Sequence, residues 1–142
     1  MNPKDKLNDL KIDNLPRILN FNDEQAPLLV ETRERVIETA QSRGPDKAEA
    51  VAATYERLAE ELLDEQLDPS RRDAPEEYKI KQLTKARGGL LINLAKIWRD
   101  AGVPDKCLEA LDRAIKFARQ NRWPSIVTAL ENEKDKLLPT GT

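Results

Sequence analysis

The clearest structural signal in the chain lies in residues 88–121, GGLLINLAKIWRDAGVPDKCLEALDRAIKFARQN. Apolar residues recur here every three or four positions on both sides of Gly102-Val103-Pro104. Such spacing is typical of amphipathic helices. A glycine followed closely by a proline marks the end of one helix and the start of the next. The segment therefore predicts two helices that pack as an antiparallel hairpin.

Similar periodicity runs through most of the chain, and prolines and glycines divide it into units. Aromatic residues make up only 4% of the sequence, and its apolar residues are dominated by leucine and alanine, which favour helices. We expect an all-α fold, in which Asp23 and Glu24 place negative charge near the start of the first helix. The five helices that we predict span residues 27–43, 46–66, 75–101, 105–121 and 124–138.

The third predicted helix carries Gly88-Gly89 in its interior and follows a predicted loop at residues 68–74. Two interior glycines cost about 2 kcal/mol relative to alanine. They therefore indicate a kink, close packing by a neighbouring segment, or a break into two helices.

We assign residues 22–138 to a single helical domain and residues 139–142 to a frayed tail. The first 21 residues form a partly ordered N-terminal arm, with at best a short helix after Asn14 because Pro16 interrupts it. The apolar residues of the arm indicate that it docks on its own domain or on a partner. They are Leu7, Leu10, Ile12, Leu15, Ile18, Leu19 and Phe21.

Gly44-Pro45-Asp46-Lys47-Ala48 echoes the turn at residues 102–107, so the hairpins 27–66 and 88–121 share a layout. The second hairpin resembles a tetratricopeptide repeat, and the first matches the same pattern more loosely. An ordinary five-helix antiparallel bundle and a short tetratricopeptide-like hairpin array both stay open. The matching residues are Val36, Ile37, Ala40 and Gly44 in the first hairpin, and Leu91, Leu94, Ala95, Trp98, Gly102, Cys107, Leu111 and Ala114 in the second.

This resemblance implies a non-enzymatic protein that binds extended peptides or helices on a concave surface formed by the first helix of each hairpin. In the second hairpin, the implied partner-binding residues are Ile92, Lys96 and Arg99. The two cations suit an acidic peptide or helix, or a C-terminal carboxylate. The first hairpin would place Glu34 and Glu38 on the same surface, and their charge has the wrong sign for such a ligand.

Charge is distributed unevenly along the chain, although the formal net charge is only −2. Residues 1–70 hold 9 Lys and Arg against 16 Asp and Glu, whereas residues 71–142 hold 15 against 10. An acidic partner for the second half would explain this asymmetry, and so would head-to-tail self-association in a structural homo-oligomer. Solvated helix faces are the simplest explanation.

Two basic clusters suggest an alternative function. Lys81 and Lys85 are four residues apart and so share a helix face. Arg113, Lys116 and Arg119 precede Trp123, and basic residues beside an aromatic ring can hold phosphates and stack a base. The alternative is therefore a small helical nucleic-acid-binding subunit of a nucleoprotein complex.

The composition argues against several kinds of chemistry. There is no histidine, which removes the commonest general base and metal ligand. The single cysteine, Cys107, lies on an apolar stripe and is interpreted as a packing residue. We expect no enzymatic activity, no metal site and no cofactor.

The cellular location of the protein can be inferred from its apolar segments. The longest apolar run is far shorter than a membrane span, and residues 1–10 lack the apolar core of a signal peptide. We expect a soluble cytoplasmic protein with no membrane contact, whose leading function is that of an adaptor or assembly module.

Overall fold

The computed structural model describes residues 3–66 and 76–138. Within these ranges every regular element is helical and there is no strand, which confirms the all-α prediction. The elements in chain order are α1 (Pro3–Lys6), the 3-10 turn η1 (Leu7–Asp9), α2 (Leu15–Ile18), α3 (Pro27–Arg43), α4 (Pro45–Gln66), α5 (Glu76–Asp100), α6 (Pro104–Gln120) and α7 (Pro124–Leu137).

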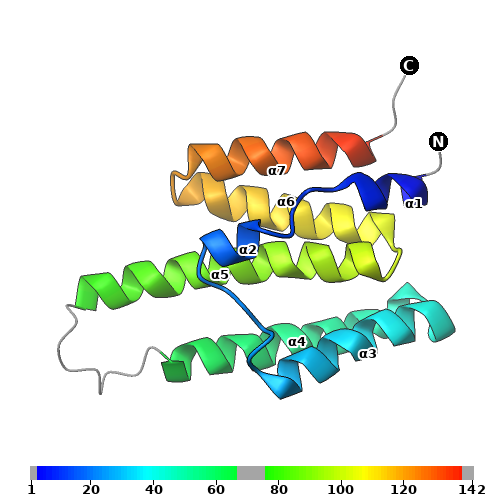
Figure 1. The fold of residues 1–142 in the computed structure, drawn as a ribbon, viewed down its shortest axis with the longest axis horizontal. Coiled ribbons are helices and arrows are strands. Elements are labelled where there is room, and N and C mark those ends of the chain that lie inside the picture. The colour runs from blue at the N-terminus through cyan, green and yellow to red at the C-terminus, as the bar shows by residue number, and fades with distance from the viewer. Residues whose placement is uncertain (1–2, 67–75, 139–142) are drawn as a thin grey trace.

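The five long helices form two hairpins and a closing helix (Figure 1). Helices α3 and α4 pack along each other, as do α5 and α6, while α7 packs on α6 and α5 contacts both α3 and α4. Tight turns connect the two helices of each hairpin. Gly44 and Gly102 occupy these turns with φ values of 96° and 76°, a backbone region that glycine adopts at little cost.

The predicted bounds of the five long helices agree with the structure to within one residue at each described end. The starts at Pro45 and Pro104 come one residue earlier than expected, because proline suits the first helical position. Its missing N–H is not needed there and its fixed φ already matches the helix. The predicted loop at residues 68–74 lies outside the described residues.

Helix α5 continues through Gly88-Gly89 without a break. A Cβ atom on Gly88 would lie 2.6 Å from Cζ3 of Trp123. On Gly89 it would lie 2.6 Å from Cβ of Phe21 and 2.9 Å from the carbonyl oxygen of Pro16. Of the three alternatives that the sequence left open, close packing by neighbouring segments therefore explains the two glycines.

The N-terminal arm, residues 3–21 of the described chain, lies along the face formed by α5 and α7 (Figure 1). Helix α2 packs on α5, and α1 contacts α7. The backbone N–H of Lys11 donates to the buried carboxylate of Glu133, and Lys136 Nζ donates to the carbonyl of Asp9 at 3.1 Å. The arm is thus held along its length by the last helix as well as by α5.

The arm contributes five side chains to the hydrophobic core. Burying a large apolar side chain stabilises a fold by about 1.5–3 kcal/mol. Together the five contribute on the order of 10 kcal/mol, which is comparable to the whole stability of a typical domain. These residues are Leu7, Leu10, Ile12, Leu19 and Phe21.

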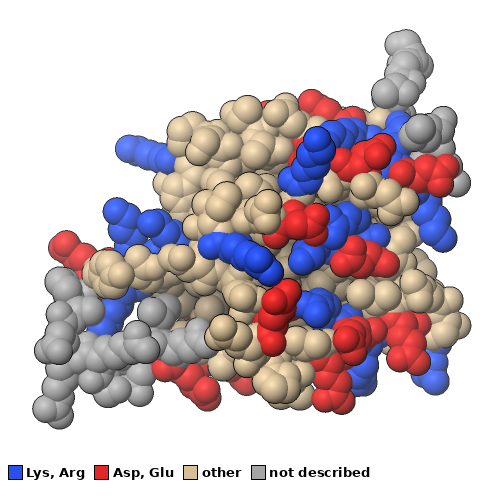
Figure 2. All heavy atoms as spheres, viewed as in Figure 1, with Lys and Arg blue, Asp and Glu red and all other residues tan. Residues whose placement is uncertain are grey.

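Many charges of the acidic first half form ion pairs with charges of the basic second half. Carboxylates of α4 pair with cations of the second hairpin: Glu49 with Lys106 at 3.2 Å, and Glu56 with Arg113 at 2.8 Å. Figure 2 shows basic and acidic side chains interspersed over the face on which the arm lies. The acidic first half and the basic second half are therefore partners across the hairpin interface rather than two opposite poles.

Candidate interaction surfaces

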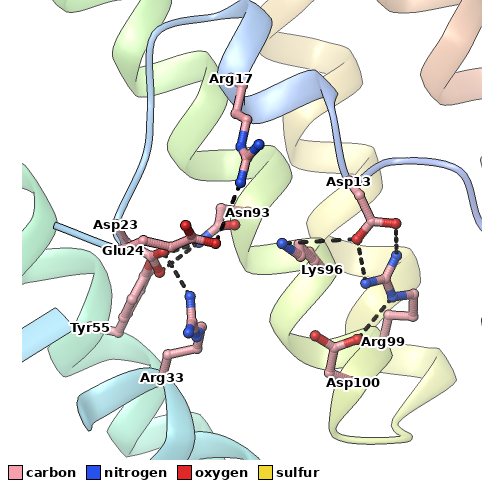
Figure 3. Close-up of polar contacts among 10 residues, drawn as sticks. All are labelled: Asp13, Arg17, Asp23, Glu24, Arg33, Tyr55, Asn93, Lys96, Arg99 and Asp100. Atoms are coloured by element: carbon pink, nitrogen blue, oxygen red, sulfur yellow. Dashed lines mark hydrogen bonds and ion pairs between the residues drawn. The ribbon is translucent and has the colours of Figure 1, made fainter. Parts of the chain in front are cut away.

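Lys96 and Arg99, the two cations expected to bind an acidic partner, contact a carboxylate of the chain itself (Figure 3). Arg99 donates to both oxygens of Asp13, at 2.7 and 3.1 Å, and Lys96 Nζ lies 3.8 Å from Oδ1. The hydrogen bond from Arg99 lowers the pKa of Asp13 below its ordinary value. In the structure, the arm of the same chain supplies the carboxylate that these two cations contact.

Ile92, the apolar member of the same expected surface, is fully buried. It lies within the core rather than at the surface, because α5 is covered on one side by the arm and on others by α4 and α6. A partner therefore has no access to Ile92 in this arrangement, and the face of α5 that the resemblance implied is filled by residues of the same chain.

A buried polar cluster joins the segment between the arm and α3 to three helices (Figure 3). Asp23, 4% exposed, accepts hydrogen bonds from the hydroxyl of Tyr55 in α4 at 2.6 Å and from Nδ2 of Asn93 in α5 at 3.1 Å. Arg33 in α3 donates to its other oxygen at 2.7 Å. Asn93 Nδ2 also donates to the Tyr55 hydroxyl at 2.6 Å.

This cluster was not predicted from the sequence. Asp23 was expected to be a favourable charge near a helix start, yet it lies four residues before α3 and points into the core. Burial and the neighbouring Asp23 carboxylate raise the pKa of Tyr55, so its hydroxyl stays protonated and donates. Since the groups satisfy one another and Asp23, Tyr55 and Asn93 are almost completely buried, the cluster is suited to joining helices and not to chemistry on a substrate.

The six residues proposed for nucleic-acid binding are only partly brought together. Lys81, Lys85 and Trp123 line one shallow pocket of about 220 Å³ beside the turn between α6 and α7. Two others are engaged elsewhere in ion pairs, Arg113 with Glu56 and Arg119 with Glu131. Lys116 lines a different pocket, between α6 and α7. The two predicted clusters therefore do not form one continuous basic patch.

Cys107 is fully buried, and its thiol donates to the carbonyl of Ala95 at 3.3 Å. Burial raises the pKa of this thiol to about 12. The thiolate, which is the reactive form, is therefore scarcely populated near neutral pH. The residue packs the interface between α5 and α6.

A groove of about 520 Å³ runs between α4 and α6, with Leu94 and Trp98 of α5 among its lining residues. The ion pairs Glu49–Lys106 and Glu56–Arg113 cross this groove, and all four residues line it. A ligand would have to displace these pairs or pass between them. The groove is therefore spanned by charge pairs made within the chain.

A second groove, of about 480 Å³, lies where α3 begins and α4 ends, and we call it the end groove. Leu28 on its wall is 57% exposed, and Glu61 and Glu65 line its rim. Neither carboxylate forms an ion pair with a described residue. Its apolar lining residues are Ala26, Pro27, Leu28, Leu29, Leu58 and Leu62.

Among the helices of the described ranges, none is long and apolar enough to cross a membrane. No protein-family model, no curated protein and no solved structure matches the chain.

Proposed function

We propose that the chain is a non-catalytic protein-interaction module that holds a partner in the end groove. The observation that carries the proposal is the open apolar groove around Leu28, rimmed by Glu61 and Glu65. A contiguous apolar surface rimmed by polar residues is typical of a protein-binding site. The carboxylates at the rim would orient a partner that carries basic residues.

The magnitude of arm burial favours the end groove over the α5 face. A partner that docked on Lys96 and Arg99 would first have to remove Asp13 and the apolar side chains around it. That removal exposes side chains worth on the order of 10 kcal/mol, more than a typical peptide interaction returns. The end groove requires no such displacement.

The polar groups of the fold support binding rather than catalysis. The thiol of Cys107 and the carboxylate of Asp23 are both buried, and each is satisfied by neighbours within the chain. A catalytic group has to reach its substrate. A free thiol of this kind also fits a reducing compartment, so we propose that the module acts in the cytoplasm.

We further propose that the α3–α4 and α5–α6 hairpins are tetratricopeptide-like units. Buried small residues at the contact between α5 and α6, among them Ala95, Cys107 and Ala114, support this idea. They let two helices approach closely, as the spacing implied. Replacing these residues with larger ones should separate the two helices and lower the free energy of unfolding.

A photo-crosslinking residue at position 28 tests the interaction module. The full chain carrying it, illuminated in a native lysate, should give a discrete crosslinked product. The same residue at the exposed position Ile18, outside the end groove, is the matched control and should not give this product. Reversing Glu61 and Glu65 to lysine should remove the product, whereas reversing Glu34 and Glu38 should leave it. Equal products from positions 28 and 18 would overturn the proposal.

Nucleic-acid binding is a second candidate, favoured by the pocket that Lys81, Lys85 and Trp123 line together. Two phosphate contacts to a single strand would give a slope near −1.4 in a plot of log affinity against log salt. Anisotropy of a labelled single-stranded oligonucleotide measures it, and Lys81→Glu with Lys85→Glu should abolish the signal. Binding that survives this double substitution would exclude the pocket.

A further inference from the structure

The first turns of α5 carry a stripe with the chemistry that the end groove lacks. Tyr78 is 55% exposed, and Lys81 and Lys85 follow it at helical spacings of three and seven residues. Residues so spaced lie along one face of a helix. Neither lysine forms an ion pair with a described residue. We call this stripe the α5 knob.

The end groove and the α5 knob are complementary in two respects. The groove offers apolar side chains, and the knob offers an exposed aromatic ring. The groove is rimmed by the carboxylates of Glu61 and Glu65, and the knob carries two ammonium groups. Opposite charges beside an apolar contact both steer the approach and fix its register.

Several other carboxylates of α4 pair with cations of the second hairpin. Glu49, Glu56 and Glu60 each pair with a cation of α5 or α6. Near the C-terminal end of α4, Asp64 also pairs with Arg87 of α5. Glu61 and Glu65 at that end form no ion pair with a described residue, and neither do Lys81 and Lys85 near the start of α5. The pairing between the acidic and basic halves of the chain is thus incomplete at this end.

The end of α4, which lines the end groove, and the start of α5, which carries the knob, lie toward the same end of the molecule, whereas α3 begins further in (Figure 1). A two-fold axis at that end brings the knob of each copy toward the groove of the other. Such an isologous arrangement makes the contact twice and closes on itself. We propose, resting on the proposed function, that the occupant of the end groove is the α5 knob of a second copy of this chain.

Charge exchange between purified full-length variants tests this dimer. The wild-type chain should sediment at twice the mass of one chain at high concentration and dissociate on dilution. Glu61→Lys with Glu65→Lys should weaken self-association on the order of 100-fold, and so should Lys81→Glu with Lys85→Glu, because each change sets like charges together in both contacts. The Glu34→Lys, Glu38→Lys variant has the same charge change as the first of these variants and should dimerise normally.

Mixing the two weakened variants gives the decisive result. In the mixed dimer, the unchanged groove of one variant meets the unchanged knob of the other, as in the wild type. In the second contact, the groove carries lysines and the knob carries glutamates, so opposite charges again face each other. The mixture, and a single chain carrying all four substitutions, should therefore dimerise like the wild type. Circular dichroism of each variant verifies that it is folded.

A wild-type chain that stays monomeric at every concentration, or a mixture that stays monomeric, would overturn the dimer. The crosslinker at position 28 separates this failure from that of the proposed function. If the purified chain is monomeric and its crosslinked product contains a different protein, the dimer is refuted and the interaction module is not. If the chain is monomeric and gives no crosslinked product, both the dimer and the interaction module are refuted.

Discussion

The arm-covered face of α5 and the end groove are built from the same materials, yet the chain fills one and leaves the other open. On α5, Lys96 and Arg99 stand beside apolar core residues, and the arm supplies both the carboxylate of Asp13 and the apolar cover. At the end groove, Glu61 and Glu65 stand beside apolar side chains, and no described segment covers Leu28. Charge and spacing on a helix therefore indicate what a surface can bind, but not whether another segment of the same chain already occupies that surface.

The largest expected effect comes from removing the centre of the buried cluster that ties the segment between the arm and α3 to three helices. Asp23→Ala leaves Tyr55, Asn93 and Arg33 without their shared acceptor. We expect a loss of about 4 kcal/mol in the free energy of unfolding, measured by urea denaturation. The neighbouring Glu24→Ala, which removes an exposed ion pair with Arg17, should cost less than about 0.5 kcal/mol. Equal losses in the two variants would contradict the description of the cluster.

A pair of substitutions compares the filled and open regions directly. Ile12→Ala truncates a fully buried side chain of the arm, and we expect it to cost about 3 kcal/mol. Leu28→Ala truncates an exposed side chain of the end groove and should change stability by less than about 0.5 kcal/mol. Thermal unfolding at one low protein concentration measures both. A large loss in Leu28→Ala would mean that the end groove is part of the core.

The close contact between α5 and the arm predicts a smaller effect. In Gly89→Ala the new Cβ meets Cβ of Phe21 and the backbone at Pro16, which overpacks the interface. The better helix propensity of alanine offsets part of this cost, so we expect a net loss of about 1–2 kcal/mol. Gly88→Ala meets the far end of the Trp123 ring, which can shift, and should lose less. A stabilised Gly89→Ala protein would show that the arm does not press on α5.

The smallest effect is electrostatic and depends on pH. The pKa of Asp13 is lowered in the folded state, so its contribution is present above about pH 4 and is lost as the pH falls through the folded value. Because the carboxylate is about half exposed, Asp13→Asn should cost less than about 1 kcal/mol at neutral pH. The difference in Tm between the two proteins should shrink as the pH is lowered from neutral to about 2. A difference that persists at low pH would assign it to something other than the charge.

The long helices could be predicted because their signals are local. The stops at Gly44 and Gly102 and the prolines that begin α4, α6 and α7 lie within the elements they punctuate. The glycine pair at residues 88–89 indicated a kink, a break or a close contact within α5. It could not show what, because the answer lies in Phe21 and Trp123, which come from distant parts of the chain.

For the candidate surfaces too, local features could be predicted from the sequence, whereas contacts between distant segments could not. The resemblance implied that Lys96 and Arg99 would bind an acidic partner, whereas in the structure they contact Asp13 of the same chain, which is 86 residues away from Arg99. Nothing local distinguishes Asp13 or Asp23 from the other carboxylates. The end groove escaped prediction because its wall combines the start of α3 with the end of α4.

By itself, the sequence determined that this protein is helical, where its long helices begin and end, and which helix faces are apolar. These features follow from residue periodicity and helix termini, which act over a few positions. Only the tertiary structure decided that the arm completes the core, that Asp23 is buried among three helices, and that Leu28 stays exposed. Those outcomes depend on which segments compete for the same apolar surface, and burial of the arm's five side chains outweighs the alternatives on α5.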